Sequence, residues 1–186
     1  ERVLHVAFRL AMSRRRHLTV VDKANVLETS RFWREIAQQL ASQYPEVELD
    51  FMFVDNAAMQ IIRQPTHFDV IVTENMFGDI LTDEASVISG SLGMLPSASV
   101  GSEVALFEPI HGSYPQAAGK NIANPMAAIL SAAMLLEHLG LTAEGSAVRD
   151  AVNRALTEGI VTEDLAAQGE RRYSTSEAGD FIAAHI

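Results

Sequence analysis

The first half of the chain alternates between short apolar runs and longer amphipathic segments. Residues 17–26 (HLTVVDKANV) begin as an apolar run and end in polar residues, and residues 68–73 (FDVIVT) are a second apolar run. Residues 47–55 (VELDFMFVD) place apolar side chains at alternate positions. A period of two is that of a half-buried strand, and a short continuous apolar run fits a strand covered on both faces. The pattern therefore predicts strands in all three segments.

Helical spacing fills the segments between these strands. Residues 30–44 predict a helix with Ser30 as its N-cap, residues 57–65 predict a short helix closed by proline, and residues 74–86 predict a helix after an Asn-Met-Phe-Gly turn. Residues 1–16 predict an amphipathic helix whose apolar side holds Val3, Leu4, Ala7, Phe8, Leu10 and Ala11. Strands that alternate with helices are typical of an α/β fold.

Glycine and proline dominate the middle of the chain. They break residues 89–125 into loops and short extended pieces, and a long glycine-rich stretch inside a compact domain is usually functional. Helical spacing returns in residues 125–139, where residues 126–136 are the most apolar segment and predict a buried helix, and again in residues 143–158. Residues 174–177 (STSE) have the spacing of a capping box, which predicts a last helix.

Composition narrows the classes of protein. Apolar residues make up 48% of the chain, which allows a real core, and the formal net charge of −10 argues against a nucleic-acid surface, which needs a basic stripe. The one basic run, residues 14–17 (RRRH), ends a helical pattern, where it complements the helix dipole. The absence of cysteine excludes a disulfide scaffold and thiolate chemistry. No apolar stretch reaches the roughly 18 residues that a membrane span needs.

Three carboxylates stand where predicted strands end. Asp55 follows FMFV, and Asp79 and Asp83 follow VIVTENMFG at the start of a helix. Like charges four residues apart on a helix point the same way and repel by roughly 0.2–0.5 kcal/mol. Ligands of open α/β sheets bind beyond the carboxyl ends of the strands, and all-oxygen ligands suit Mg²⁺ or Mn²⁺. The alternative is that Asp79 only complements the helix dipole and that Asp83 is a solvated surface charge.

Polar residues in other loops leave more than one interpretation open. Lys23 and Asn25 follow the first predicted strand, where a lysine in a confined site acts as a base or binds an anionic substrate; an exposed surface lysine is the alternative. Residues 108–125 (EPIHGSYPQAAGKNIANP) combine glycines with His111 and Asn124, which suits one wall of a nucleotide pocket. The stretch is not a G-x-G-x-x-G fingerprint, and His111 also fits an ordinary loop histidine.

Four separated motifs together resemble one known family. They are VDKANVLETSRFWRE, FVDNAAMQ, FDVIVTENMFGDILTDEASVISGSLGMLPSAS and EPIHGSYPQAAGKNIANP. In this order they resemble the 3-isopropylmalate dehydrogenases, the leucine-biosynthesis branch of the β-decarboxylating dehydrogenases, over essentially the whole chain. The isocitrate, homoisocitrate and tartrate dehydrogenases share much of the pattern but fit less well.

The resemblance implies a fold and an activity. The fold is α/β with mixed sheets flanked by helices and a discontinuous two-domain arrangement, in which residues 1–90 belong to a substrate and dimerisation domain and residues 91–186 to a cofactor-binding domain. The activity is oxidation of a 2-hydroxy acid, 3-isopropylmalate, by NAD⁺, followed by loss of CO₂ from the β-keto acid with the help of Mg²⁺ or Mn²⁺. The implied enzyme is a cytoplasmic homodimer with shared active sites, and neither nucleic acid nor a membrane is its partner.

The resemblance also implies roles for individual residues. Asp79 and Asp83 match the metal ligands of the family, and Asp55 matches its third metal carboxylate. Lys23 matches the catalytic lysine near the substrate hydroxyl, and Asn25 matches a residue beside cofactor and substrate. In the family, the lysine and the third carboxylate come from the neighbouring subunit. The resemblance therefore implies that Lys23 and Asp55 complete the site of a partner subunit. It also implies that both are catalytic, and that Lys23, Asn25, Asp55 and Asp79 bind the substrate.

A second group of residues matches the segment that holds adenine and its ribose. This group is His111, Gly112, Ser113, Gln116, Ala117 and Asn124. The family places an aspartate at the position of Gln116, where it accepts hydrogen bonds from the ribose hydroxyls. Since the loop offers only Lys120 as a cation, we expect NAD rather than NADP.

The resemblance covers only part of the family's length. Family members extend further on the N-terminal side, in a part that carries the substrate-binding arginines, so we expect this chain to be the C-terminal portion of an enzyme and to be inactive by itself. One alternative is a non-catalytic fragment or paralogue that serves as an interaction module. Another is a tartrate or homoisocitrate dehydrogenase relative. A stand-alone metal-dependent hydrolase would need a nucleophile or base pair that the sequence does not offer.

Overall fold

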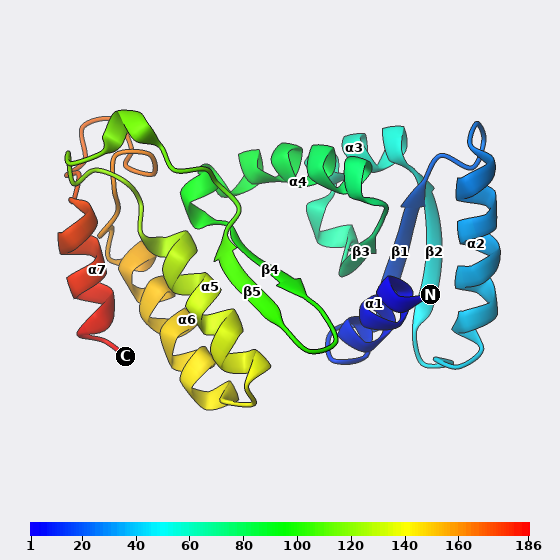
Figure 1. Ribbon diagram of the computed structural model, residues 1–186. Coiled ribbons are helices and arrows are strands. Elements are labelled where there is room, and N and C mark those ends of the chain that lie inside the picture. The colour runs from blue at the N-terminus through cyan, green and yellow to red at the C-terminus, as the bar shows by residue number, and fades with distance from the viewer. The chain divides into compact units, whose positions relative to one another are not determined.

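A computed structural model describes residues 1–186, and the chain separates into two compact units. The first unit is Glu1–Ile88 and the second is Ser89–Ile186. No helix in either unit has the length and apolar character needed to cross a membrane. Figure 1 shows that the first unit is built around a sheet, whereas the second packs helices beside a two-stranded hairpin.

The first unit is built on a three-stranded parallel sheet. Its strands are β1 (His17–Asp22), β2 (Glu48–Phe53) and β3 (Val70–Val72), in the order β2-β1-β3. Thr19 in the middle of β1 lies opposite Asp50 of β2 and Ile71 of β3. All three strands predicted from the sequence are confirmed, with shorter bounds.

Helices cover both faces of this sheet. Leu18 and Val20 of β1 face a core formed with α1 (Arg2–Met12) and α2 (Glu28–Ala41). Val21 points the other way, into a core formed with α3 (Val54–Arg63) and α4 (Asn75–Ser89). A short 3-10 helix, η1 (Pro65–His67), links α3 to β3.

The strand order explains why the helices divide in this way. The chain moves from β1 to β2 through α2, and then passes back over β1 to β3 through α3. Parallel crossovers are almost always right-handed, so two crossovers in opposite directions place their helices on opposite faces. Helix α4, which follows β3, lies on the same face as α3, so the chain leaves the neighbouring strands β1 and β3 toward different faces. This is the arrangement that opens a crevice at the carboxyl ends of the strands.

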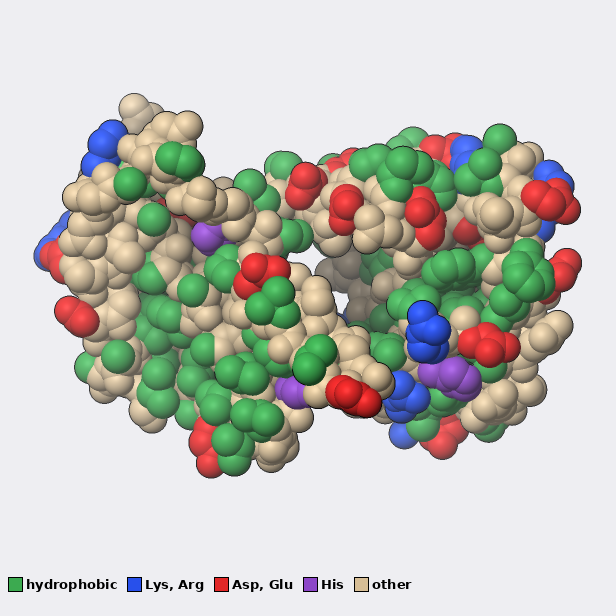
Figure 2. Space-filling view, viewed as in Figure 1, with side chains coloured by type: hydrophobic (Ala, Val, Ile, Leu, Met, Phe, Trp, Pro, Cys, Tyr) green, Lys and Arg blue, Asp and Glu red, His purple; other side chains and the backbone are tan.

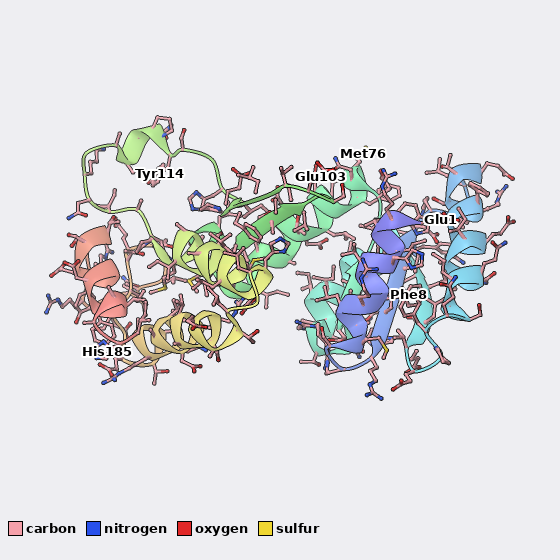
Figure 3. The ribbon with its side chains drawn as sticks, turned by 60° about the horizontal axis from the view of Figure 1, so that its bottom comes forward. Glu1, Phe8, Met76, Glu103, Tyr114 and His185 are labelled. Atoms are coloured by element: carbon pink, nitrogen blue, oxygen red, sulfur yellow. The ribbon has the colours of Figure 1, made fainter.

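The N-terminal helix is shorter than predicted, and its apolar side is narrower. Helix α1 ends at Met12. Phe8, seen on this helix in Figure 3, is fully buried and stacks on Tyr44 with 4.7 Å between ring centroids. Leu4, Ala7, Phe8 and Ala11 of the predicted apolar side are buried, whereas Val3 and Leu10 are about half exposed.

The basic run after α1 does not complement a helix dipole as the sequence suggested. The carboxylate of Asp69, whose side chain is 1% exposed, accepts hydrogen bonds from the Arg14 side chain and the Arg15 N–H, both at 2.9 Å. Burial raises the pKa of Asp69, but hydrogen bonds from Arg14 and from the backbone of His17 and Arg15 outweigh it, and the pKa is lowered. Arg16 pairs with Glu46 at 2.7 Å. The run therefore fastens the turn before β1.

The predicted N-cap of α2 is also wrong. The helix begins at Glu28, so Ser30 lies inside its first turn and is buried. The Ser30 hydroxyl accepts a hydrogen bond from the N–H of Lys23 at 3.1 Å. The side chain still satisfies a backbone donor, but the donor belongs to the loop after β1 and not to its own helix.

The second unit packs helices against a two-stranded antiparallel hairpin. The strands β4 (Pro96–Val100) and β5 (Ala105–Pro109) pair with each other, and α5 (Met126–His138) contacts both. The other elements are the 3-10 helices η2 (Leu92–Met94) and η3 (Pro115–Ala117) and the helices α6 (Thr142–Thr157) and α7 (Thr175–Ala183). The first sheet is purely parallel and the second purely antiparallel, so the expected mixed sheets are not found among these residues.

The helices of the second unit share one core. Met126 of α5, Val152 of α6 and Ile182 of α7 are fully buried in it. The prediction that the apolar segment of α5 is buried holds for only part of the helix, because Leu135 is 40% exposed. Figure 2 shows apolar side chains on the surface of the helix pair α5 and α6. The capping box of α7 is confirmed, with Ser174 and Glu177 each bonded to the other's backbone N–H.

Candidate active site

Polar residues gather at the carboxyl edge of the parallel sheet. Asp22 is the last residue of β1, and Lys23 follows it. Helix α3 starts directly after β2, so Asp55 lies in its first turn and not in a loop. Beyond β3, the Thr73 hydroxyl donates to the carbonyl of Val21 at 2.8 Å, which ties the end of β3 to β1. This bond holds the ends of β1 and β3 together.

Lys23 and Asp55 form an ion pair across this edge. The Lys23 Nζ lies 2.8 Å from the Asp55 Oδ1 and 5.9 Å from the centroid of the Phe53 ring. The Lys23 side chain is 26% exposed, whereas that of Asp55 is 65% exposed. The hydrogen bond from Lys23, helped by backbone N–H groups, lowers the pKa of Asp55. The alternative that Lys23 is an unattached surface lysine is therefore not what the structure shows.

Sequence reasoning missed a buried ion pair at the residue that directly precedes Lys23. Asp22 is 3% exposed and accepts two hydrogen bonds from Arg34 of α2, at 2.5 and 3.0 Å. The Arg34 guanidinium also lies 5.1 and 4.9 Å from the ring centroids of Phe51 and Phe53. The only sequence signal was an aspartate at the end of an apolar strand, next to Lys23. The pair fixes the chain direction at the point where Lys23 leaves the sheet.

Asp79 and Asp83 lie on exposed turns of α4. Glu74 already accepts hydrogen bonds from the N–H groups of Met76 and Phe77, at 3.3 and 3.1 Å, so the helix start is capped without Asp79. The Asp79 carboxylate accepts a hydrogen bond from the Asn75 side chain at 3.5 Å, and no basic side chain pairs with either aspartate. Two carboxylates on one side of a helix, without a basic partner, fit a hard cation such as Mg²⁺ or Mn²⁺.

The three predicted metal carboxylates do not meet within one chain. The one cluster of three metal-ligating side chains is His17, Asp50 and His67, at the other edge of the sheet. Asp55 is instead paired with Lys23. Asn25 is exposed in the turn that follows Lys23, and that turn is closed by hydrogen bonds from the N–H groups of Val26 and Leu27 to the Lys23 carbonyl.

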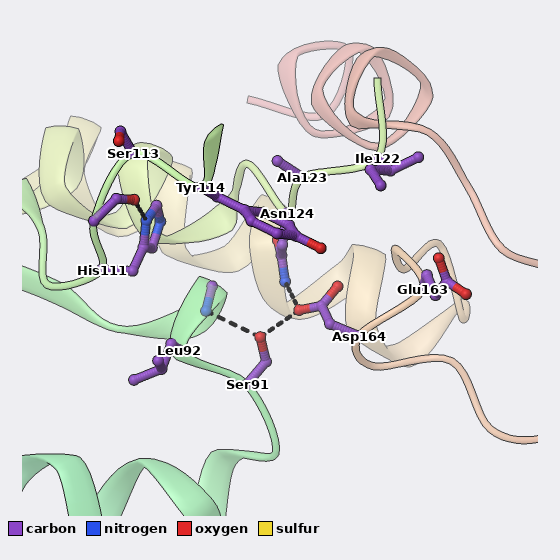
Figure 4. A pocket seen from close by; sticks show the side chains of 12 residues that line it. Ser91, Leu92, His111, Ser113, Tyr114, Ile122, Ala123, Asn124, Glu163 and Asp164 are labelled. Carbon is purple, nitrogen blue, oxygen red and sulfur yellow. Dashed lines mark hydrogen bonds between the residues drawn. The ribbon is translucent and has the colours of Figure 1, made fainter. Parts of the chain in front are cut away.

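The second unit contains a separate pocket of about 570 Å³. Asp164 organises its floor, accepting hydrogen bonds from the side chains of Ser91 and Asn124, the latter at 3.0 Å (Figure 4). The Thr162 hydroxyl donates to the other oxygen of Asp164 at 2.5 Å. Burial raises the pKa of Asp164, but these hydrogen bonds outweigh it and lower the pKa. Sequence reasoning missed Asp164 because it lies far along the chain from the glycine-rich loop.

Four of the six predicted cofactor-binding residues line this pocket. They are His111, Gly112, Ser113 and Asn124. Gln116 and Ala117 lie in η3 outside the lining, with Gln116 exposed and Ala117 buried. Tyr114, labelled beside η3 in Figure 3, has a left-handed backbone (φ 44°), which is uncommon for a residue other than glycine. Such strain is concentrated at functional sites.

Small residues bring the loops around the pocket together. A Cβ on Gly93 would lie 2.6 Å from the Cβ of Asn124, which no real contact allows. The Asn124 side chain also accepts a hydrogen bond from the N–H of Met126 at 2.9 Å, at the start of α5. The pocket volume is within the range of small-molecule sites, about 300–1,000 Å³. The mixed apolar and amide lining fits an adenosine group.

Known sequences match this chain along almost its whole length. The chain is 59% identical over 186 residues to a 3-isopropylmalate dehydrogenase of Bacteroides fragilis, covering 100% of this chain and 53% of the relative. It is 62% identical over 179 residues to one of Geobacillus kaustophilus, covering 95% of this chain and 48% of the relative. The chain thus spans about half the length of the curated relatives it matches.

Solved structures and a family model point the same way. A crystal structure of isocitrate dehydrogenase from Methylococcus capsulatus matches with a TM-score of 0.92 and 40% identity, over 99% of this chain and 55% of that one. A β-decarboxylating dehydrogenase from Thermococcus kodakarensis matches with a TM-score of 0.89 and 41% identity, over 99% and 53%. The model of the isocitrate/isopropylmalate dehydrogenase family matches residues 1–182. The chain belongs to the isocitrate/isopropylmalate dehydrogenase family.

Proposed function

We propose that this chain is part of an enzyme that oxidises and decarboxylates 3-isopropylmalate with NAD⁺, in leucine biosynthesis in the cytoplasm. The observation that carries the proposal is the Lys23–Asp55 pair at the carboxyl edge of the parallel sheet, one strand away from the carboxylates of α4. Identity favours this substrate over isocitrate, since the 3-isopropylmalate dehydrogenases match at 59–62% and the isocitrate dehydrogenase at 40%.

The residues at the sheet edge have separate roles in this proposal. Lys23 holds or accepts a proton at the substrate hydroxyl, because its partly exposed Nζ lies at the carboxyl edge of the sheet, whereas the Arg34 guanidinium is bonded to the buried Asp22. Asp55 positions that Nζ at 2.8 Å, and Asn25 adds a neutral hydrogen-bonding group for the substrate. NAD⁺ would accept the hydride, after which CO₂ leaves the β-keto acid.

Asp79 and Asp83 would hold the divalent cation from one subunit, with Asp79 also contacting substrate. The cation would polarise the substrate hydroxyl and carboxylate as a Lewis acid. Because Asp55 does not converge with these two within a chain, we propose that Asp55 and Lys23 complete the site of a partner subunit in a homodimer. Residues 1–90 would form the substrate and dimerisation domain.

Residues 91–186 would belong to the cofactor-binding domain. His111, Gly112, Ser113 and Asn124 would surround the adenosine part of the cofactor, with Gln116 and Ala117 on the adjoining loop. The pocket lining includes Glu163 but neither lysine nor arginine. A 2′-phosphate would meet negative charge there, so the pocket favours NAD over NADP. A higher kcat/KM with NADP than with NAD in the intact protein would contradict this.

The role of Lys23 is tested with a conservative variant. Lys23→Arg keeps the positive charge and a partner for Asp55, but an arginine does not give up its proton. We expect kcat for NADH formation from 3-isopropylmalate to fall by about 10²–10⁴, the range for general acid–base catalysis, with an unchanged melting temperature. An active Lys23→Arg enzyme would remove Lys23 from the proton-transfer step.

The metal site is tested by titrating the intact protein with Mn²⁺ in a calorimeter. Asp79→Asn and Asp83→Asn should each weaken Mn²⁺ binding, whereas Glu84→Gln, a change of the same kind on the same helix, should leave it unaltered. If all three variants bind Mn²⁺ as tightly as the wild type does, α4 does not hold the cation.

The substrate and the extent of the active portion need separate measurements. Comparing kcat/KM for 3-isopropylmalate, homoisocitrate and tartrate decides among the related activities. We also expect the 186-residue chain by itself to give no turnover, since it spans about half of its relatives and positioning can supply roughly 7–11 kcal/mol of barrier reduction. A catalytically silent intact protein that still folds would favour the interaction module instead.

A further inference from the structure

Two histidines and an aspartate meet at the amino edge of the parallel sheet, opposite the edge that carries Lys23. His17 is the first residue of β1, Asp50 lies in β2, and His67 ends η1. One ligand atom of each lies within 4.8 Å of the other two. Nothing in the proposed dehydrogenase reaction uses these residues.

The sheet register explains how they meet. His17 and Thr19 are two residues apart, so their side chains lie on one face of β1, and Asp50 lies opposite Thr19 on that same face. η1 brings His67 over this face, with its ring centroid 5.4 Å from that of His17 in an edge-on arrangement. The cluster is therefore built from adjacent strands and one fixed turn, not from flexible loops.

The donor atoms are available for a ligand. One oxygen of Asp50 accepts the N–H of Phe51 at 2.7 Å, and the other lies 3.9 Å from the Nε2 of His67, too long for a hydrogen bond. On the same face, the fully buried hydroxyl of Thr19 has no hydrogen-bond partner, which is rare for a buried polar atom.

Nearby arginines do not occupy the cluster. Arg14 and Arg15 are held by Asp69, and Arg15 also donates to the carbonyls of Thr66 and Phe68, on either side of His67. Arg16 is paired with Glu46. Glu48 lies opposite His17 in the register and adds a further carboxylate to the same face. The anionic oxygen of Asp50 thus remains free for a cation.

We propose that His17, Asp50 and His67 bind a divalent transition-metal ion of the zinc class, with water in the remaining position. Imidazole suits Zn²⁺ and its neighbours in the first transition row, whereas Mg²⁺ prefers oxygen ligands. The three donor atoms already lie within 4.8 Å of one another, so side-chain rotations would bring them around one ion. The ion links η1 to β1 and β2 and so stabilises the amino edge of the sheet.

The test is a Zn²⁺ titration of the intact, chelator-treated protein by calorimetry, together with its melting temperature. We expect one Zn²⁺ per chain and a higher melting temperature with Zn²⁺. His17→Gln and His67→Gln should each weaken binding at least about 100-fold, since losing even an outer-shell partner costs 10–100-fold. His185→Gln, a control in the second unit, should bind as the wild type does.

Three results would overturn the proposal. The first is a wild-type protein that binds no Zn²⁺, which would leave His67 and Asp50 as an ordinary surface ion pair. The second is unchanged binding in His67→Gln. The third is loss of binding in the double variant Asp79→Asn/Asp83→Asn, which would place the zinc on α4. Retained binding in that double variant supports the site whether or not the dehydrogenase proposal is correct.

Discussion

Replacing Arg34 by methionine should destabilise the protein by about 4–5 kcal/mol. Methionine keeps much of the side-chain volume but removes both hydrogen bonds to Asp22, whose side chain is 4% exposed. Removing one partner of a buried pair costs about 3–5 kcal/mol, because the remaining charge is left without compensation. The Arg34 side chain is 26% exposed, which admits water and favours the lower end of that range. The lost contacts with the rings of Phe51 and Phe53 add roughly 0.5–1 kcal/mol each.

Urea denaturation of the intact protein measures this loss. Arg154→Met is the matched control, since Arg154 forms an exposed pair with Glu158 on α6 and should cost less than about 1 kcal/mol. The double variant Asp22→Asn/Arg34→Met should lose less stability than the sum of the two single variants, as expected for residues in contact. A loss for Arg34→Met no larger than for Arg154→Met would refute the reasoning that the buried pair supports the strand end.

Three further predictions concern other parts of the chain. Ser174→Ala removes the cap that accepts the Glu177 N–H and should cost about 1 kcal/mol in chemical denaturation. Gly145→Ala should lower the melting temperature although alanine favours helices, because its Cβ would lie 3.1 Å from the Ala133 carbonyl oxygen. The lowered pKa of Asp69 stabilises the fold above its unfolded pKa of about 3.9, and this contribution is lost as pH falls through the folded pKa. The stability difference between wild type and Asp69→Asn should therefore narrow below about pH 4.

Local sequence signals were enough for the elements whose determinants are themselves local. The alternation in β2, the apolar runs of β1 and β3 and the capping box of α7 all specify their element without distant partners. No equivalent local signal marks the turn between α1 and β1. Its arginines bind Asp69, more than 50 positions away along the chain. A charge run has the same composition whether it complements a helix end or a buried carboxylate, so the pattern by itself favoured the wrong alternative.

The residues of the candidate site also fall into two groups: those that their place in the sequence indicates, and those that only contacts between distant residues reveal. Lys23 and Asp55 could be named from their places after strands, but their ion pair depends on β1 and β2 being neighbours. Asp22 and Asp164 were not identified, because an aspartate that organises buried hydrogen bonds looks like any other until its partners are known. The same limitation applies to His17, Asp50 and His67, since only the register and η1 bring them together.

The direct junction between β2 and α3 limits how this protein can change over evolution. Phe53 is the last residue of the strand, and Val54 is already the first of the helix. Each residue of an α-helix turns through about 100°. One residue inserted or deleted between the paired part of β2 and Asp55 would therefore rotate the carboxylate away from Lys23, with no loop to absorb the change. Substitutions can be tolerated here while changes of length are not, so an alignment gap at this junction in any homologue would mark a protein whose site is built differently.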